Sequence, residues 1–265
     1  MLALIAGAAA ASPPALELEG AFVQGGLVRG QVPPGSEVRF AGRRLRLDPA
    51  GRFLLGFGRD DAGGEALLVR YPDGSRIERR LVIKGRDYRI ERVDGLPPRE
   101  VSPSAEDLVR IGAEAKRIEA ARERDSAAPR IAPAFVWPVV GPITGVYGSQ
   151  RILNGEPRAP HRGIDIAAPA GSPVGAMADG VVSLAAPDMY FTGNTVMIDH
   201  GYGLHSVYAH LSELAVEVGQ TVRKGQPIGR VGATGRATGP HLHWGVYWFG
   251  QALDPALQVG PMPQS

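Results

Sequence analysis

Short segments in which apolar and polar residues alternate run through the first third of the chain, as they do along half-buried β-strands. They are separated by turn sequences such as Pro-Pro-Gly and Asp-Pro-Ala-Gly. The clearest hairpin is formed by residues 66–71 and 76–83, which flank Pro-Asp-Gly-Ser. Residues 18–95 therefore predict an N-terminal β domain, a small sandwich of immunoglobulin-like architecture. Its arginine-rich strands could touch glycan or a partner, although a solvated strand face is the simpler interpretation.

Residues 96–130 predict a helical linker, because the alternation gives way to a helical period after a proline-rich stretch. Ser104 stands three residues before Asp107 in a capping-box arrangement, and the helical pattern ends near Arg124. Apolar residues follow at helical spacing: Leu108, Ile111, Ala115 and Ile118. So narrow an apolar stripe favours docking on one of the two flanking domains over a coiled coil.

Residues 131–260 predict a second domain that is also mainly β. Short β-branched or aromatic segments bounded by glycines occur at 146–148, 181–184, 195–198, 206–209 and 227–231. We expect an antiparallel sheet with a functional groove on one face. The segment 238–247 extends this pattern, because His241 and His243 share one side of an extended strand, whereas Leu242 and Trp244 face the other.

Five of the chain's potential metal ligands and proton carriers are concentrated in this second domain. They are His161, Asp165, His210, His241 and His243, in a chain that has only six histidines. A catalytic zinc ion takes three protein ligands and leaves a position for water, so His161, Asp165 and one histidine of the His-x-His pair would complete a site. The chain has no cysteine, so thiolate ligands are excluded. His200, in a glycine-rich turn, and His205 are interpreted as structural.

These motifs, in this order, resemble the lysostaphin/LytM-type zinc peptidases, which cut peptidoglycan. The similarity extends to Val146-Tyr-Gly-Ser-Gln-Arg151, Val218-Gly-Gln-Thr-Val and Gly232-Ala-Thr-Gly-Arg236, and covers residues 131–258. The resemblance implies that Zn²⁺ is held by His161, Asp165 and His243, and that His210 and His241 flank the catalytic water. Which of the two is the base stays open. Tyr190 could line the substrate cleft, with a core or rim position as the alternative.

By the same resemblance, the chain is a zinc metalloendopeptidase that hydrolyses peptide cross-links of bacterial peptidoglycan. A D-amino-acid cross-link of a Gram-negative-type wall is expected in preference to a glycine bridge. Two other classes of protein are alternatives: a catalytically silent or self-inhibited regulator of murein amidases, and a biotinyl- or lipoyl-type carrier. The complete residue set argues against the silent regulator, and Lys224 does not lie in a carrier-type Met-Lys-Met sequence.

Composition and the first residues of the chain bear on its cellular location and on the class of its partner. The net charge is only +2 at pH 7, which predicts no nucleic-acid partner. Of the 265 residues, 44% are hydrophobic, which is typical of a globular protein. Residues 1–17 resemble the remnant of a signal peptide, although no basic residue precedes Arg29. No apolar run reaches the length of a membrane span. We expect a periplasmic or secreted protein, with peptidoglycan as its partner and the N-terminal β domain as a site for a regulatory partner.

Overall fold

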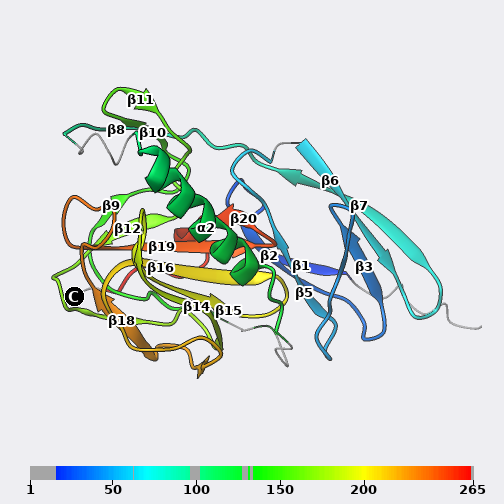
Figure 1. Cartoon of the computed structure of the whole chain (residues 1–265). Coiled ribbons are helices and arrows are strands. Elements are labelled where there is room, and N and C mark those ends of the chain that lie inside the picture. Colours follow the sequence, from blue (N-terminus) through cyan, green and yellow to red (C-terminus); the bar gives the residue numbers. More distant parts are fainter. Residues whose placement is uncertain (1–15, 62, 96–101, 127–130, 132–133, 264–265) are drawn as a thin grey trace, which may run out of the picture.

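The computed structural model describes residues 16–61, 63–95, 102–126, 131 and 134–263, and most of the regular structure is β (Figure 1). Residues 1–15, which carry most of the expected signal-peptide remnant, lie outside the described residues. The first seven strands are β1 (Glu17–Gly20), β2 (Leu27–Gln31), β3 (Glu37–Phe40), β4 (Arg43–Leu45), β5 (Arg52–Gly56), β6 (Gly63–Arg70) and β7 (Arg76–Ile83).

The N-terminal strands form two small antiparallel sheets. One has the order β1-β2-β5 and the other β4-β3-β6-β7. The hairpin predicted around Pro-Asp-Gly-Ser is β6–β7, closed by a hydrogen bond of 2.9 Å from the Tyr71 amide to the Ser75 carbonyl. Alternate residues of β3 and of the second half of β6, including Val38 and Leu67, are fully buried, as the period-two pattern of the sequence predicts, whereas β5 is buried throughout residues 53–56. Immunoglobulin-like topology stays a prediction.

The only α-helix among the described residues, α2 (Ala105–Arg122), begins at the predicted cap. The Ser104 hydroxyl accepts a hydrogen bond of 3.1 Å from the Asp107 amide, and the Asp107 carboxylate accepts one from the Ser104 amide, which completes the capping box. Ala121 is buried beside residues of the large sheet, and the Arg122 guanidinium lies 4.1 Å from the centre of the Tyr247 ring. The helix therefore docks on the second β region, where Figure 1 shows it crossing the sheet diagonally.

The second β region is one ten-stranded sheet, and its main path runs β17-β14-β15-β16-β19-β12-β9, with every pair antiparallel. Its strands are β9 (Ile143–Gly145), β12 (Ile164–Ala167), β13 (Pro173–Gly175), β14 (Gly180–Met189), β15 (Gly193–Asp199), β16 (Leu204–Leu214), β17 (Thr221–Val222), β18 (Pro227–Val231), β19 (His241–Trp248) and β20 (Gln251–Leu253), and a short 3₁₀ helix, η1 (Pro255–Leu257), follows.

One predicted strand is wrong. Residues 146–148 form a turn between β9 and β10 (Gln150–Leu153), although Val146 and Tyr147 have side chains typical of strands. Gly148, which has a φ of 78°, turns the chain there. The turn places the Val146 carbonyl 3.2 Å from Nδ1 of His161.

A small third sheet joins the two halves of the chain. Its order is β11-β10-β8, with β11 at Glu156–Pro157 and β8 at Ile90–Val93. β8 precedes the helical linker, yet it pairs in parallel with β10, which places Glu91 opposite Arg151. Glu91, which belongs to the first 95 residues, thus lies beside Arg151 in the second half of the chain.

The N-terminal sheets also pack directly on the end of β19. Phe40 lies 6.1 Å from Trp248 between ring centres, the Asp61 carboxylate accepts a hydrogen bond of 2.9 Å from Gln251, and Arg86 forms an ion pair of 2.8 Å with Asp254. A single hydrophobic cluster runs through both halves. The N-terminal sheets are therefore fixed at the end of β19 that carries Trp248, away from the end that carries His241.

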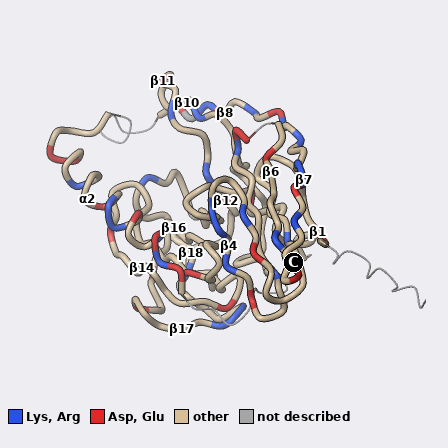
Figure 2. The backbone as a smooth tube through the Cα atoms, turned by 90° about the vertical axis from the view of Figure 1, so that its right-hand side faces the viewer, with Lys and Arg blue, Asp and Glu red and all other residues tan. Residues whose placement is uncertain are grey.

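Charged residues of both signs are interspersed along the chain in Figure 2. None of the helices in the described part of the chain combines the length and the apolarity needed to cross a membrane.

Candidate active site

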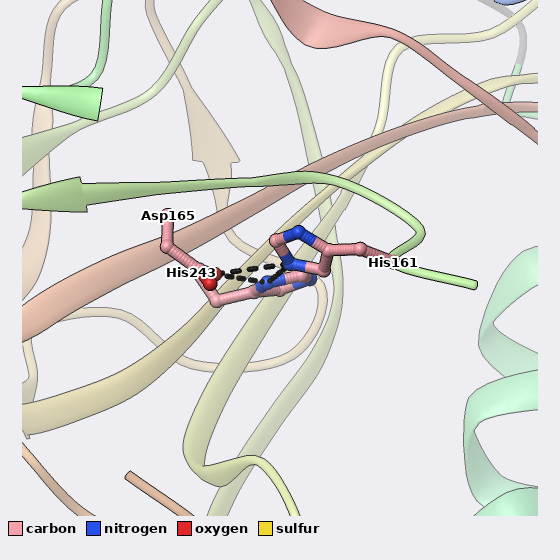
Figure 3. A group of neighbouring side chains, drawn as sticks. All are labelled: His161, Asp165 and His243. Carbon is pink, nitrogen blue, oxygen red and sulfur yellow. Dashed lines mark hydrogen bonds and ion pairs between the residues drawn. The ribbon is translucent and has the colours of Figure 1, made fainter. Parts of the chain in front are cut away.

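Three potential ligand atoms converge at the junction of β12 and β19. Oδ1 of Asp165 lies 3.1 Å from Nε2 of His161 and 2.8 Å from Nδ1 of His243, and the two nitrogens are 3.0 Å apart (Figure 3). Within the described residues this is the one group of three or more His, Cys, Asp or Glu side chains whose ligand atoms come this close.

Strand register explains why residues 78 positions apart meet. Asp165 of β12 is the cross-strand partner of His243 of β19, and Ala167 is the partner of His241. Because side chains alternate across a strand, His241 and His243 lie on the same face as Asp165, whereas Leu242 and Trp244 are fully buried on the other. The prediction that His241 and His243 lie on one face of the strand, opposite Leu242 and Trp244, is confirmed.

The hydrogen bonds of the ligands orient them for a cation. Nδ1 of His161 faces the Val146 carbonyl, so it donates and leaves a lone pair on Nε2 toward Asp165. Burial alone would raise the pKa of Asp165, but its close contacts with the rings of His161 and His243 hold that pKa well below its usual range. Burial lowers the pKa of His243, which favours the neutral ring that a metal requires.

This donor set fits a divalent metal. Three acceptor atoms 2.8–3.1 Å apart repel one another unless a cation or shared protons lie between them. Zinc bonds of about 2.0–2.2 Å place two ligands of one tetrahedron about 3.3 Å apart, close to this spacing. Two imidazoles and one carboxylate leave a fourth position open, as catalytic zinc sites do.

His210 and His241 form a pair beside the three ligands. Their ring centres are 4.7 Å apart, and Nε2 of His241 lies 4.0 Å from Oδ1 of Asp165. Nδ1 of His210 donates to the Thr234 carbonyl at 2.8 Å, and Nδ1 of His241 donates to the Gly239 carbonyl at 2.8 Å. Nε2 is therefore the ring nitrogen that each histidine has available for chemistry.

The backbone of His210 is in the left-handed region, with a φ of 62°, which is uncommon for a residue other than glycine. The surrounding contacts hold it there, since its amide donates to the Thr192 carbonyl at 2.8 Å while its ring bonds Thr234. Burial lowers the pKa of this histidine to about 3. Such local strain is typical of functional sites.

An open pocket of about 350 Å³ lies beside these groups. Its wall includes Asp165, His210 and His241, together with two arginines to which sequence analysis gave no role, Arg151 and Arg236. Arg151 donates to Oδ2 of Asp165 at 2.7 Å and lies 3.7 Å from Glu91, the pocket's one lining residue among those described upstream of position 131. Both arginines occur in the segments that carry the family resemblance, which is the signal that could have found them.

Tyr190, the candidate cleft residue, is not among the residues that line this pocket. Its amide donates to the Glu114 carboxylate of α2 at 2.8 Å, and its ring meets Phe191 edge-on at 4.9 Å. Its ring also lies 5.9 Å from the Arg110 guanidinium of α2, and a role for Tyr190 in the cleft stays a prediction.

His200 and His205 lie in a separate buried network. Nδ1 of His200 donates to the Asp179 carbonyl at 2.7 Å, and Nε2 accepts from the Ser206 hydroxyl at 2.8 Å. Burial lowers the pKa of His200 to about 4, and burial also lowers the pKa of His205. Neither residue belongs to the candidate site.

Acid should destabilise the fold through His200. In the unfolded chain, a histidine has a pKa near 6.5. Between pH 6.5 and about 4, the unfolded state therefore binds a proton at His200, whereas the folded state does not. Stability is therefore expected to fall as the pH drops through this window, by an amount on the order of 3 kcal/mol from His200. Urea unfolding at pH 7 and pH 4.5 measures it. His200→Gln should show a smaller loss, and an equal loss in both proteins would contradict the assignment.

Comparison with known proteins places the site in a family. A sequence model of peptidase family M23 matches residues 159–255. The chain is 47% identical to DD-carboxypeptidase/endopeptidase Mpg of Neisseria meningitidis over 104 residues, which are 39% of this chain and 24% of that protein. It is 44% identical to peptidoglycan DD-endopeptidase ShyA of Vibrio cholerae over 40% of this chain and 25% of that protein. The chain thus spans about a quarter of the length of these relatives.

The similarity to a solved structure is broader. A Pseudomonas aeruginosa protein assigned to peptidase M23 aligns with 90% of this chain and 95% of its own, at 32% identity and a TM-score of 0.67. That alignment includes the N-terminal sheets as well as the pocket region, since it leaves only a tenth of the chain unmatched.

Proposed function

This chain belongs to peptidase family M23, and on that premise we propose that it is a zinc metalloendopeptidase that hydrolyses peptide cross-links of bacterial peptidoglycan. The observation that carries the proposal is the convergence of His161, Asp165 and His243 beside the pair His210 and His241, at a pocket that Asp165, His210 and His241 line. The names of the relatives Mpg and ShyA support the substrate class and favour a D-amino-acid cross-link.

The proposed roles follow from the hydrogen bonds of each side chain. His161, Asp165 and His243 would hold zinc, which when bound supplies a Lewis acid and acidifies a water molecule. Arg151 binds the carboxylate oxygen of Asp165 that faces away from His243, and so orients the other oxygen toward the metal position.

His210 and His241 would carry the protons. Each ring donates from Nδ1 to a carbonyl, so Nε2 accepts a proton when the ring is neutral and donates one when the ring is charged. One takes a proton from the attacking water, and the other stabilises the developing oxyanion or protonates the leaving amine. Burial of His210 favours its neutral form, in which Nε2 carries the lone pair that a base needs.

The cellular setting is part of the proposal. Peptidoglycan lies outside the cytoplasmic membrane, so we place the protein in the periplasm or outside the cell. The N-terminal sheets, held at the far end of β19, would be available to a regulatory partner without covering the pocket.

Digestion of purified peptidoglycan, followed by mass analysis of the muropeptides, tests this function. Zinc-loaded protein is expected to convert cross-linked dimers into monomers, whereas chelated protein is not. The masses of the products identify the bond. Stoichiometric zinc binding without any product would contradict the endopeptidase and favour the regulator of murein amidases.

A further inference from the structure

The linker helix α2 carries one carboxylate that is largely withdrawn from solvent. The side chain of Glu114 is only 14% exposed, whereas Glu106 and Glu119 of the same helix are exposed. Burying a carboxylate costs free energy unless hydrogen bonds replace those of water. Glu114 has two such bonds, because Nε of Arg110, one turn earlier in the helix, donates to Oε1 at 2.8 Å and the backbone amide of Tyr190 donates to Oε2 at 2.8 Å. The second bond leaves the helix and reaches the loop between β14 and β15.

The β14–β15 loop links α2 to the candidate site within three residues. Its first residue, Tyr190, donates its amide proton to Glu114. Its third residue, Thr192, accepts a hydrogen bond of 2.8 Å from the backbone amide of His210 through its carbonyl. The register of the two strands shifts at 186–189, just before the loop, so the regular ladder does not by itself fix where the loop lies. A displacement of the loop at its Glu114 end would therefore move the acceptor of the His210 amide.

His210 depends on such external contacts more than a regular strand residue does. Its φ of 62° lies in the left-handed region, and a residue with a side chain keeps that conformation only where its surroundings hold it. Two hydrogen bonds do so. One joins the backbone amide to Thr192, and the other joins Nδ1 of the ring to the Thr234 carbonyl at 2.8 Å. Loss of the first would let the backbone relax and would change the direction in which Nε2 points.

We propose that Glu114 is a positioning residue for His210, and that it acts through the backbone of the β14–β15 loop. This inference rests on the proposed function and deepens it, because it makes the linker helix part of the catalytic unit. The negative charge strengthens the contact, since an amide bonds a carboxylate more strongly than it bonds a neutral acceptor. The helix is docked by other residues, Ile118 and Ala121, which pack on the buried cluster of the sheet, so removal of the carboxylate leaves the helix in place.

Three variants of the full-length, zinc-loaded protein test the proposal through the cleavage of muropeptide dimers. Glu114→Ala removes the acceptor of the Tyr190 amide. It is expected to lower kcat by about 10-fold while KM changes by less than about two-fold, because a misplaced proton carrier slows the chemical step without weakening substrate binding. Glu114→Gln keeps an oxygen that can accept from the same amide and should retain at least about half of the wild-type kcat. Glu119→Ala removes an exposed carboxylate from the same helix and should match the wild type in both constants.

Amide hydrogen exchange, followed by NMR on the same proteins without substrate, separates this role from a general loss of stability. Zinc content should be the same in all of them. The His210 amide should exchange about 10-fold faster or more in Glu114→Ala than in the wild type, whereas the amides of Val207 and Tyr208 in the middle of β16 should keep their rates.

Three results would overturn the inference: wild-type exchange at His210 in Glu114→Ala, a wild-type kcat in that variant, or an equal rise in exchange at all three amides. If Glu114→Ala speeds exchange at His210 alone but no protein cleaves the dimers, the wild type included, the proposed function is overturned and the positioning of His210 by Glu114 stands.

Discussion

A His243→Ala variant is expected to lose both bound zinc and the hydrolysis of cross-linked muropeptides, with a fall in rate on the order of 10³-fold or more. The reason is geometric, because Nδ1 of His243 lies 2.8 Å from Asp165 and 3.0 Å from Nε2 of His161. Without it, two ligands remain, too few to hold a catalytic zinc ion. Metal content by plasma mass spectrometry and cleavage of dimers are measured on the same sample.

The control for this experiment is a neighbouring change outside the pocket. Arg162→Ala alters an exposed side chain next to His161 and should leave zinc content and rate near those of the wild type. Thermal unfolding of the zinc-free proteins shows whether His243→Ala still folds. Wild-type zinc affinity in a folded His243→Ala protein would remove this residue from the metal site.

Variants of the two flanking histidines should separate metal binding from catalysis. His210→Asn and His241→Gln are expected to bind zinc at one equivalent, yet to lose about 10²- to 10⁴-fold in kcat, the usual contribution of a positioned acid or base. Asparagine is chosen at position 210 because it tolerates the left-handed backbone found there, with its φ of 62°. Steady-state cleavage of muropeptide dimers gives the rates.

His200→Gln is the matched control, because it changes a buried histidine that hydrogen-bonds Asp179 and Ser206 away from the pocket. Near neutral pH its cleavage rate should equal that of the wild type. A zinc-loaded His210→Asn or His241→Gln protein that cleaves at the wild-type rate would show that the residue in question carries no proton in the reaction.

Much of the site could be predicted because it depends on short-range pattern. The alternation in β19 places His241 and His243 on one face with no knowledge of the rest of the fold, and the structure confirms this. The Ser104 cap of α2 is equally local, because a capping box spans only four residues. In each case a few neighbouring residues determine the conformation.

Other features depend on contacts between distant parts of the chain. β8 lies in the segment assigned to the N-terminal β domain, and nothing within it indicates that it pairs in parallel with β10, some 60 positions away. The role of Arg151 follows from its contact with Asp165, so it is not visible until the strands are placed. Val146 shows the opposite case. Its side chain is typical of strands, yet the residue lies in a turn, and its carbonyl faces Nδ1 of His161.

The length of β19 has a consequence for protein engineering. One strand of eight residues begins with His241 and ends with Trp248, whose side chain packs so close to Gly56 of β5 that an added Cβ there would lie 2.8 Å from it. A chimera that fused residues 131–265 alone to a foreign wall-binding module would uncover Trp248 and leave the Asp254 carboxylate without Arg86. Cell-wall lysins built from this chain should therefore take the N-terminal sheets along as part of the cassette and attach the foreign module at a surface other than these sheets.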